Sequence, residues 1–94
     1  MFDIHIAGDG IVKLSGRLDA AESNRALGVL RTLDRAATVD FSELDYISSA
    51  GISALIETHK RLHGAGHELK LIGLKPRVRN VFAYAGLDRL LDIE

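Results

Sequence analysis

Cysteine is absent from the 94-residue sequence, and so is any long apolar run. The absence of cysteine excludes disulfides, thiolate catalysis and cysteine-based zinc sites, and it is compatible with a reducing cytoplasm. No apolar run approaches the roughly 20 residues that a membrane-spanning helix needs. The first residues also lack the charged and apolar regions of a signal peptide. We therefore expect a cytoplasmic protein with no membrane insertion.

An excess of positive charge is missing as well. Lysine and arginine together number 12 and the acidic residues 13, so the formal net charge is −1. Such a chain has no global field that would draw it to nucleic acid or to an anionic membrane. Aromatic residues are only 5% of the sequence and do not interleave with basic ones, which further disfavours nucleic-acid binding. Hydrophobic residues make up 47%, and we expect residues 1–94 to fold as a single globular domain with one modest core.

A hairpin is predicted at the beginning of the chain. Apolar and polar residues alternate over residues 2–6, which predicts a half-buried strand. Gly8-Asp9-Gly10 is a strong turn signal, and residues 11–18 are typical of a returning strand. We therefore expect the first two strands to pair antiparallel.

The remainder of the chain alternates helices with strands. Apolar residues recur at helical spacing in three segments, at roughly 20–35, 51–64 and 76–85. Short apolar runs predict strands at 39–41 and 69–74, and a last short strand at 90–93. Strands that alternate with helices imply parallel pairing through right-handed crossovers. The expected fold is α/β, with one mixed sheet, antiparallel in its first hairpin and largely parallel elsewhere, packed against about three helices.

Residues 39–52 form the stretch on which the functional argument depends. A short apolar strand leads into a polar turn, and the turn ends in Ser48-Ser49-Ala50-Gly51, where a helix begins. Serine is among the best N-cap residues, so either Ser48 or Ser49 is expected in that place. The free amides and the dipole of the helix also favour an anion there, such as a phosphate on Ser49. Ala50 and Gly51 add little bulk, so a partner's backbone could approach closely.

The same residues resemble a known family. Asp40-Phe41-Ser42, followed after a turn by Tyr46-Ile47-Ser48-Ser49-Ala50-Gly51-Ile52, resembles the signature of STAS domains, in particular the bacterial anti-sigma factor antagonists. Gly16-Arg17-Leu18-Asp19 is similar to the family's second strand and its acidic end, and the segment from Lys75 to Leu87 is similar to its last helix. The resemblance implies a STAS fold and phosphorylation of the serine before the small-residue–glycine pair, here Ser49. Many members have aspartate before that serine, whereas this chain has Ser48, which makes Ser48 a minor alternative site.

The resemblance further implies a partner-switching cycle. Unmodified protein would bind an anti-sigma factor that has a serine-kinase fold, and so release a sigma factor. That kinase, using ATP and magnesium, would phosphorylate Ser49 and end the complex, and a metal-dependent serine phosphatase would restore binding. The chain would be a substrate and not an enzyme, with no catalytic residue and no cofactor of its own. The expected contact surface comprises Asp19, Ser48, Ser49, Ala50, Gly51, Ile52 and Ser53.

Two other functions fit less of the sequence. STAS-like domains also serve as small structural subunits of lipid-transport complexes that dock on an ATPase, and the serine would then be only a helix cap. A hydrolase with Ser49 as its nucleophile lacks a base and a third group, and the pattern Gly-x-Ser-x-Gly is absent. The Ser-Ser-Ala-Gly run keeps a serine in the modifiable position and favours the antagonist.

Three aspartates are candidates for a carboxylate cluster around the serines: Asp19, Asp40 and Asp45. The alternative is that Asp19 caps the first helix and Asp45 shapes a turn. If the strand ends before the first and second helices lie side by side, Asp19 stands near Ser49.

Histidines and basic residues give weaker signals. His59 and His63 are one helical turn apart, as in a two-ligand metal pair, with His67 four residues beyond. The first two fall close to the apolar stripe of their helix, so we expect part-buried or flanking side chains and no metal site. A short basic patch, either a contact surface or a solvated face, consists of Lys75, Arg77, Arg79 and Arg89.

Overall fold

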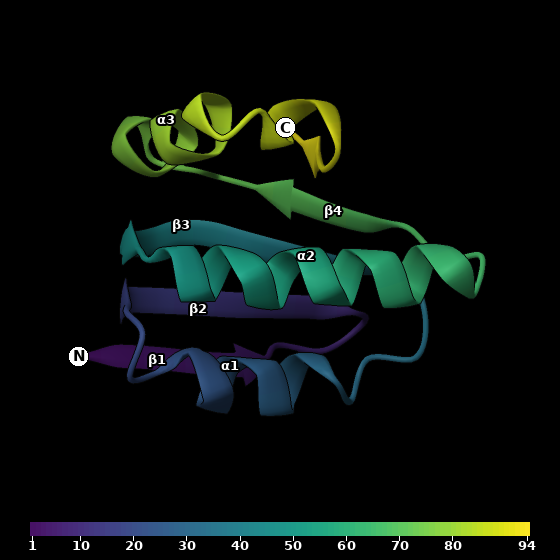
Figure 1. Ribbon diagram of the computed structural model, residues 1–94. Coiled ribbons are helices and arrows are strands. Elements are labelled where there is room, and N and C mark those ends of the chain that lie inside the picture. Colours follow the sequence, from purple (N-terminus) through teal and green to yellow (C-terminus); the bar gives the residue numbers. More distant parts are fainter.

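A computed structural model of the protein describes residues 1–94 as one five-stranded sheet with helices packed on it (Figure 1). The elements are β1 (Phe2–Ile6), β2 (Ile11–Leu18), α1 (Ser23–Leu30), β3 (Ala37–Ile47), α2 (Ser49–Gly64), β4 (Leu69–Ile72), α3 (Pro76–Tyr84), the 3-10 helix η1 (Leu87–Arg89) and β5 (Asp92–Ile93). In Figure 1, α1 and α2 lie side by side in front of the sheet, and α3 lies beyond β4. No helix has both the length and the apolar character that crossing a membrane requires.

The sheet is mixed, as the sequence predicts. Its spatial order is β1-β2-β3-β4-β5, with β1 and β2 antiparallel and every other neighbouring pair parallel. Between β1 and β2, the predicted turn contains three consecutive residues with positive φ, Gly8, Asp9 and Gly10. Glycine adopts such angles at no steric cost, which explains why the reversal falls there. The predicted fold class and the antiparallel first pair are confirmed.

One face of the sheet carries the core. Along β2 and β3, alternate side chains such as Leu14 and Val39 are buried, while Lys13 and Asp40 between them point to the opposite, polar face. The helices cover the apolar face, and the rings of Phe41 in β3 and Phe82 in α3 meet edge to face with centroids 6.0 Å apart. The fold therefore leaves one helical layer and one open sheet face.

Strand β3 is longer than the sequence predicts. The expected strand ended at residue 41 and was followed by a polar turn, but residues 42–46 continue the strand to Ile47. The pairing of β2 with β3 has two register shifts, which accommodate the extra residues of β3 as bulges. Within the first bulge, the amide of Ser42 donates to the carboxylate of Asp40 at 2.9 Å. The polar residues interrupt the apolar pattern without ending the strand, so the predicted turn is wrong.

Helix α1 is shorter than the predicted range of 20–35. The carboxylate of Asp19 accepts from the amide of Glu22 at 3.1 Å in a turn before the helix, and the N-cap residue is Glu22 itself. The prediction that Asp19 caps this helix is therefore wrong. At the other end, the guanidinium of Arg61 in α2 donates to the carbonyls of Leu30 and Leu33. These bonds satisfy carbonyls that a longer helix would otherwise have to pair.

The carboxyl-terminal part agrees closely with its prediction. Strand β4 ends two residues early, because Gly73 takes a φ of 70° and turns the chain away. Helix α3 begins at Pro76, and Gly86 follows it in the left-handed conformation, as expected for a C-terminal cap. The predicted last strand is present as the two-residue β5, which pairs with β4.

Candidate functional site

The carboxyl ends of β2 and β3 meet at one edge of the sheet. Leu18 is paired with Ile47, and the amide of Ser48 donates to the carbonyl of Leu18 at 2.8 Å. Asp19 and Ser48 are the next residues of the two chains, so they follow neighbouring strand ends. The expectation that these strand ends lie side by side is confirmed, and α2 begins at this edge (Figure 1).

Ser48 is the N-cap of α2. Its backbone is extended, and its Oγ accepts from the amide of Gly51 at 3.2 Å. Its carbonyl accepts the first full helical bond, from Ile52, at 2.9 Å. The hydroxyl of Ser48 is thus occupied in a role that stabilises the helix. Of the two serines left open by the sequence, the cap is Ser48 and not Ser49.

Ser49 is the first residue within α2. Its side chain is exposed and makes no hydrogen bond within the chain. The first turn contains no acidic side chain, and the amides of Ser49 and Ala50 have no acceptor in the helix. A phosphate on this hydroxyl would therefore meet free amides and the positive end of the helix dipole.

Gly51 faces the protein interior. A Cβ added there would lie 2.8 Å from Cγ of Leu18 and 2.9 Å from Cγ1 of Ile47, both in buried side chains. The glycine is required because the start of α2 packs closely on the ends of β2 and β3. The expectation that Gly51 leaves room for a partner is wrong, since the space beside it is filled by the chain itself.

The other predicted contact residues differ in exposure. Ser49 and Ser53 are exposed, whereas Asp19, Ser48 and Ala50 are half-buried. Ile52 is 8% exposed and belongs to the core. A partner can contact the exposed and the half-buried residues of this set. Gly51 and Ile52 are buried, so they act only indirectly, by holding the helix in place.

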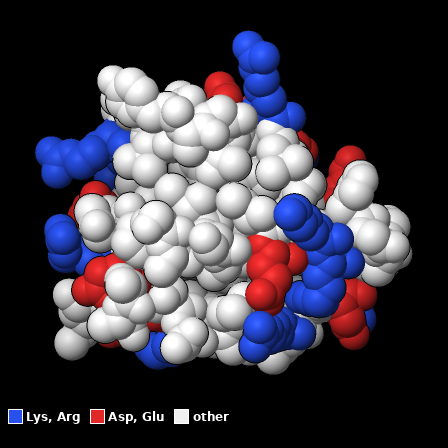
Figure 2. All heavy atoms as spheres, in the orientation of Figure 1, with Lys and Arg blue, Asp and Glu red and all other residues white.

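A shallow groove continues from this site between the two front helices. It has a volume of about 300 Å³ and is lined by Ser23, Asn24 and Leu27 of α1 and Ala50, Ser53, Ala54 and Glu57 of α2. Figure 2 shows that charged side chains are sparse over the middle of this face and gather around its rim. The sequence did not reveal this groove, because it depends on how α1 and α2 pack together.

The three aspartates do not form a carboxylate cluster. Asp45 pairs with the ammonium of Lys75, whose hydrogen bond holds the pKa of that carboxyl below its ordinary value. The pKa of Asp40 is also lowered, mainly by the hydrogen bond from the amide of Ser42. Asp19 accepts from its own turn. Each carboxylate has its own partner, and Asp45 lies in β3 rather than in the turn that the sequence predicted.

His59 and His63 lie on α2, as the sequence predicts, and His67 lies beyond the end of the helix. His59 is half-buried and His63 exposed, and their rings stack 18° from parallel with centroids 5.5 Å apart. Nδ1 of His59 is buried without a hydrogen-bond partner. No group of three or more side chains is arranged to hold a metal ion.

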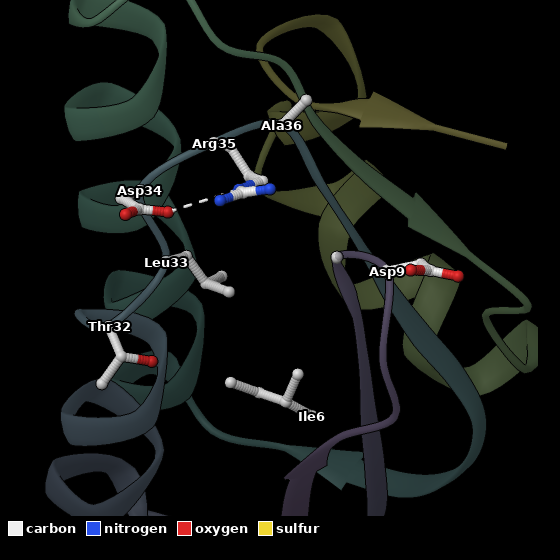
Figure 3. A pocket seen from close by; sticks show the side chains of 8 residues that line it. Ile6, Asp9, Thr32, Leu33, Asp34, Arg35 and Ala36 are labelled. Atoms are coloured by element: carbon white, nitrogen blue, oxygen red, sulfur yellow. Dashed lines mark ion pairs between the residues drawn. The ribbon is translucent and has the colours of Figure 1, made fainter.

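The largest hollow of the surface is at the opposite edge of the sheet from Ser49. It has a volume of about 550 Å³, and Ile6, Thr32 and Leu33 line it together with the β1–β2 turn (Figure 3). An ion pair between Asp34 and Arg35, 3.6 Å long, lies at its rim. Nothing connects this hollow to the serines.

Comparison with known proteins adds the family. The family model described as "Mlab, STAS domain" matches residues 4–92. The chain belongs to the STAS domain family. A Bordetella bronchiseptica protein provisionally named anti-sigma factor antagonist BtrV is 43% identical over 53 residues, which are 56% of this chain and 46% of that protein. The chain thus matches about half the length of this curated relative.

Solved structures share the STAS fold at low sequence identity. An anti-sigma factor antagonist of Thermotoga maritima, also provisionally named, has a TM-score of 0.81 at 19% identity, over 98% of this chain and 84% of the other. The phosphorylated form of Bacillus SpoIIAA has a TM-score of 0.72 at 18% identity, over 100% of this chain and 91% of the other. The unphosphorylated form of SpoIIAA, which is named an anti-sigma factor antagonist, has a TM-score of 0.70 at 17% identity. At such identities these likenesses establish the fold.

Proposed function

We propose that this STAS domain is an anti-sigma factor antagonist that is switched by phosphorylation of Ser49. The observation that carries the proposal is that two adjacent serines have different environments. Ser48 caps α2 through its hydroxyl, and Ser49 presents a free, exposed hydroxyl one residue later. Removal or modification of the second hydroxyl costs the fold little, so it is available for regulation.

Phosphorylation of Ser49 would change the surface more than the fold. A phosphate adds about −1.5 to −2 charges, and at a helix N-terminus the helix tolerates that charge. A partner that packs on the charge-poor face beside Ser49 would have to desolvate it, which is unfavourable. The switch therefore acts by blocking an interface.

Two relatives support this proposal. BtrV is provisionally named an anti-sigma factor antagonist, which supports the same function for this chain. The two SpoIIAA structures show that a protein of this fold exists in phosphorylated and unphosphorylated forms. For this chain we propose the corresponding cycle. An anti-sigma factor with a serine-kinase fold binds the unmodified protein, phosphorylates Ser49 with ATP and is released, and a metal-dependent serine phosphatase restores binding.

In this scheme the chain is a cytoplasmic binding module and substrate, with no catalytic residue of its own. The proposed contact surface is centred on Ser49 and includes the exposed Ser53 and the half-buried Asp19, Ser48 and Ala50. The groove between α1 and α2 extends it.

The test is affinity capture from the native cell with two baits, Ser49→Ala and Ser49→Asp. We expect the alanine bait to retain a protein with a serine-kinase fold and the aspartate bait to lose it. Matched control baits are Ser42→Ala and Ser42→Asp, which make the same changes at an exposed serine of β3. Both control baits should retain the partner, and retention by both Ser49 baits alike would refute the switch.

A second candidate function is the structural subunit of a lipid-transport ATPase complex. The observation that favours it is the matched family model, which is described as "Mlab, STAS domain" and not as an anti-sigma factor antagonist. The match therefore leaves room for the other role of STAS-like domains, that of a transport subunit. In that case position 49 is only the first residue of a helix, and the two Ser49 baits would bring down the same transport ATPase.

A further inference from the structure

Three cations surround one carboxylate at the edge of the sheet where Ser49 lies. We call Arg17, Lys75 and Arg77 the basic cluster; Asp45 is at its centre. The ammonium of Lys75 pairs with Asp45, and the same carboxylate feels the charges of Arg77 and Arg17. Asp45, Lys75, Pro76 and Arg77 line an open hollow of about 470 Å³ that contains no hydrophobic side chain. The cluster therefore keeps an excess of positive charge in a chain whose net charge is −1.

The stability of the fold does not explain these cations. Lys75 is the N-cap of α3 and makes no capping bond through its side chain, and Arg77 lies in the first turn, which has no acidic residue. Basic side chains at that end of a helix oppose its dipole. Asp45 offsets one of the three charges, and its pairing with Lys75 is solvent-exposed, where such a pair contributes little to stability.

One tyrosine contacts the cluster, and the other follows it along α3. The guanidinium carbon of Arg17 lies 4.3 Å from the centre of the Tyr46 ring, and that tyrosine is 37% exposed. Tyr84 is two helical turns beyond Arg77 on α3, with Asn80 between them, and is 92% exposed. Tyrosine and arginine are among the residues enriched in the hot spots of protein interfaces.

We propose that the basic cluster, with Tyr46 and Tyr84, docks an acidic segment of a protein partner at the end of the sheet where Ser49 lies. Charge complementarity identifies the chemistry of the partner. The grouped positive charges attract carboxylates, and the tyrosine rings offer surfaces on which a polypeptide that carries those carboxylates can pack. The identification of this partner with the anti-sigma factor rests on the proposed function. The docking surface itself does not, because it shares no residue with the serine switch.

The test uses a defined probe, a fluorescein-labelled oligoglutamate of about ten residues, with binding followed by fluorescence anisotropy at low and high salt. The variant Arg17→Ser/Arg77→Ser leaves the Lys75–Asp45 pair intact. The matched control Arg31→Ser/Arg35→Ser removes two positive charges elsewhere, at the C-cap of α1 and in the loop that follows it. Thermal melts by circular dichroism establish that both variants are folded.

We expect the wild type and the control to bind the probe with similar affinity at low salt, and the cluster variant to bind about tenfold more weakly. Salt should weaken wild-type binding and leave the cluster variant nearly unaffected. Equal affinity of the two variants, or no binding by the wild type, would overturn the proposal.

The proposed function can fail independently. The Ser49→Asp variant should bind the probe as the wild type does, because the probe reports on the cluster and not on the serine. If the Ser49 baits capture no kinase-fold protein while the probe still distinguishes the two arginine variants, the switch is wrong and the acidic docking surface stands.

Discussion

Ser48 and Ser49 differ by one position and should differ sharply in their contribution to stability. The alanine substitution of Ser48 removes the oxygen that accepts from the amide of Gly51 at 3.2 Å. Loss of a serine N-cap typically costs about 1 kcal/mol of unfolding free energy. The substitution of Ser49 removes an exposed hydroxyl without a hydrogen bond in the chain and adds a better helix former, so the change should stay within about 0.5 kcal/mol.

The assay is urea unfolding of the two single variants and the wild type, followed by circular dichroism. Thermal melts give a second readout. A loss of about 1 kcal/mol in a domain of this size lowers the melting temperature by roughly 4–8 °C, which is easily resolved. If the m value, the slope of unfolding free energy against urea concentration, is the same for all three proteins, the variants unfold in the same way as the wild type. Equal losses for both variants, or a larger loss for Ser49→Ala, would refute the assignment of the cap to Ser48.

Three further predictions concern packing, pH and the contact between helices. Gly51→Ala should lower the unfolding free energy by about 1–3 kcal/mol, since its Cβ would press on Leu18, whereas Gly64→Ala, with open space around it, should leave it unchanged or slightly higher in the same denaturation series. The folded-state pKa of Asp40 lies below the usual value of 3.8, so the ionised carboxylate stabilises the fold above that pH, and the stabilisation is lost as the pH falls through the lowered pKa. Asp40→Asn should therefore make the unfolding free energy fall less steeply between about pH 5 and pH 2. An unchanged fall in the variant would contradict this assignment. Arg61→Lys should cost about 1 kcal/mol, because an ammonium cannot reproduce a fork that bonds two carbonyls at the end of α1; full retention of the melting temperature would show those bonds to be dispensable.

Local signals were sufficient for most elements of this fold. The Gly8-Asp9-Gly10 turn, the proline at the start of α3 and the glycine after it each act within a few residues, and the structure contains all three as expected. The parallel pairing after the first hairpin followed from the alternation of strands with helices.

Long-range contacts decided what the sequence could not. Residues 42–46 are polar and suggest a turn, but pairing with β2 and two bulges keep them in β3. The role of Gly51 depends on side chains of Leu18 and Ile47 that pack from two other strand ends. The Arg17–Tyr46 contact joins residues of two strands whose register no local pattern gives. The site was thus predictable as a serine at a helix start, while its surroundings required the fold.

The most direct test of the central claim compares two purified forms of the protein, one with serine and one with phosphoserine at position 49. Their affinities for the kinase-fold protein captured by the Ser49→Ala bait can be measured by isothermal titration calorimetry. The switch predicts tight binding of the serine form and a loss of at least about a hundredfold on phosphorylation, with both forms melting within a few degrees of each other. Equal affinity of the two forms would contradict the account and leave Ser49 as an ordinary first residue of α2.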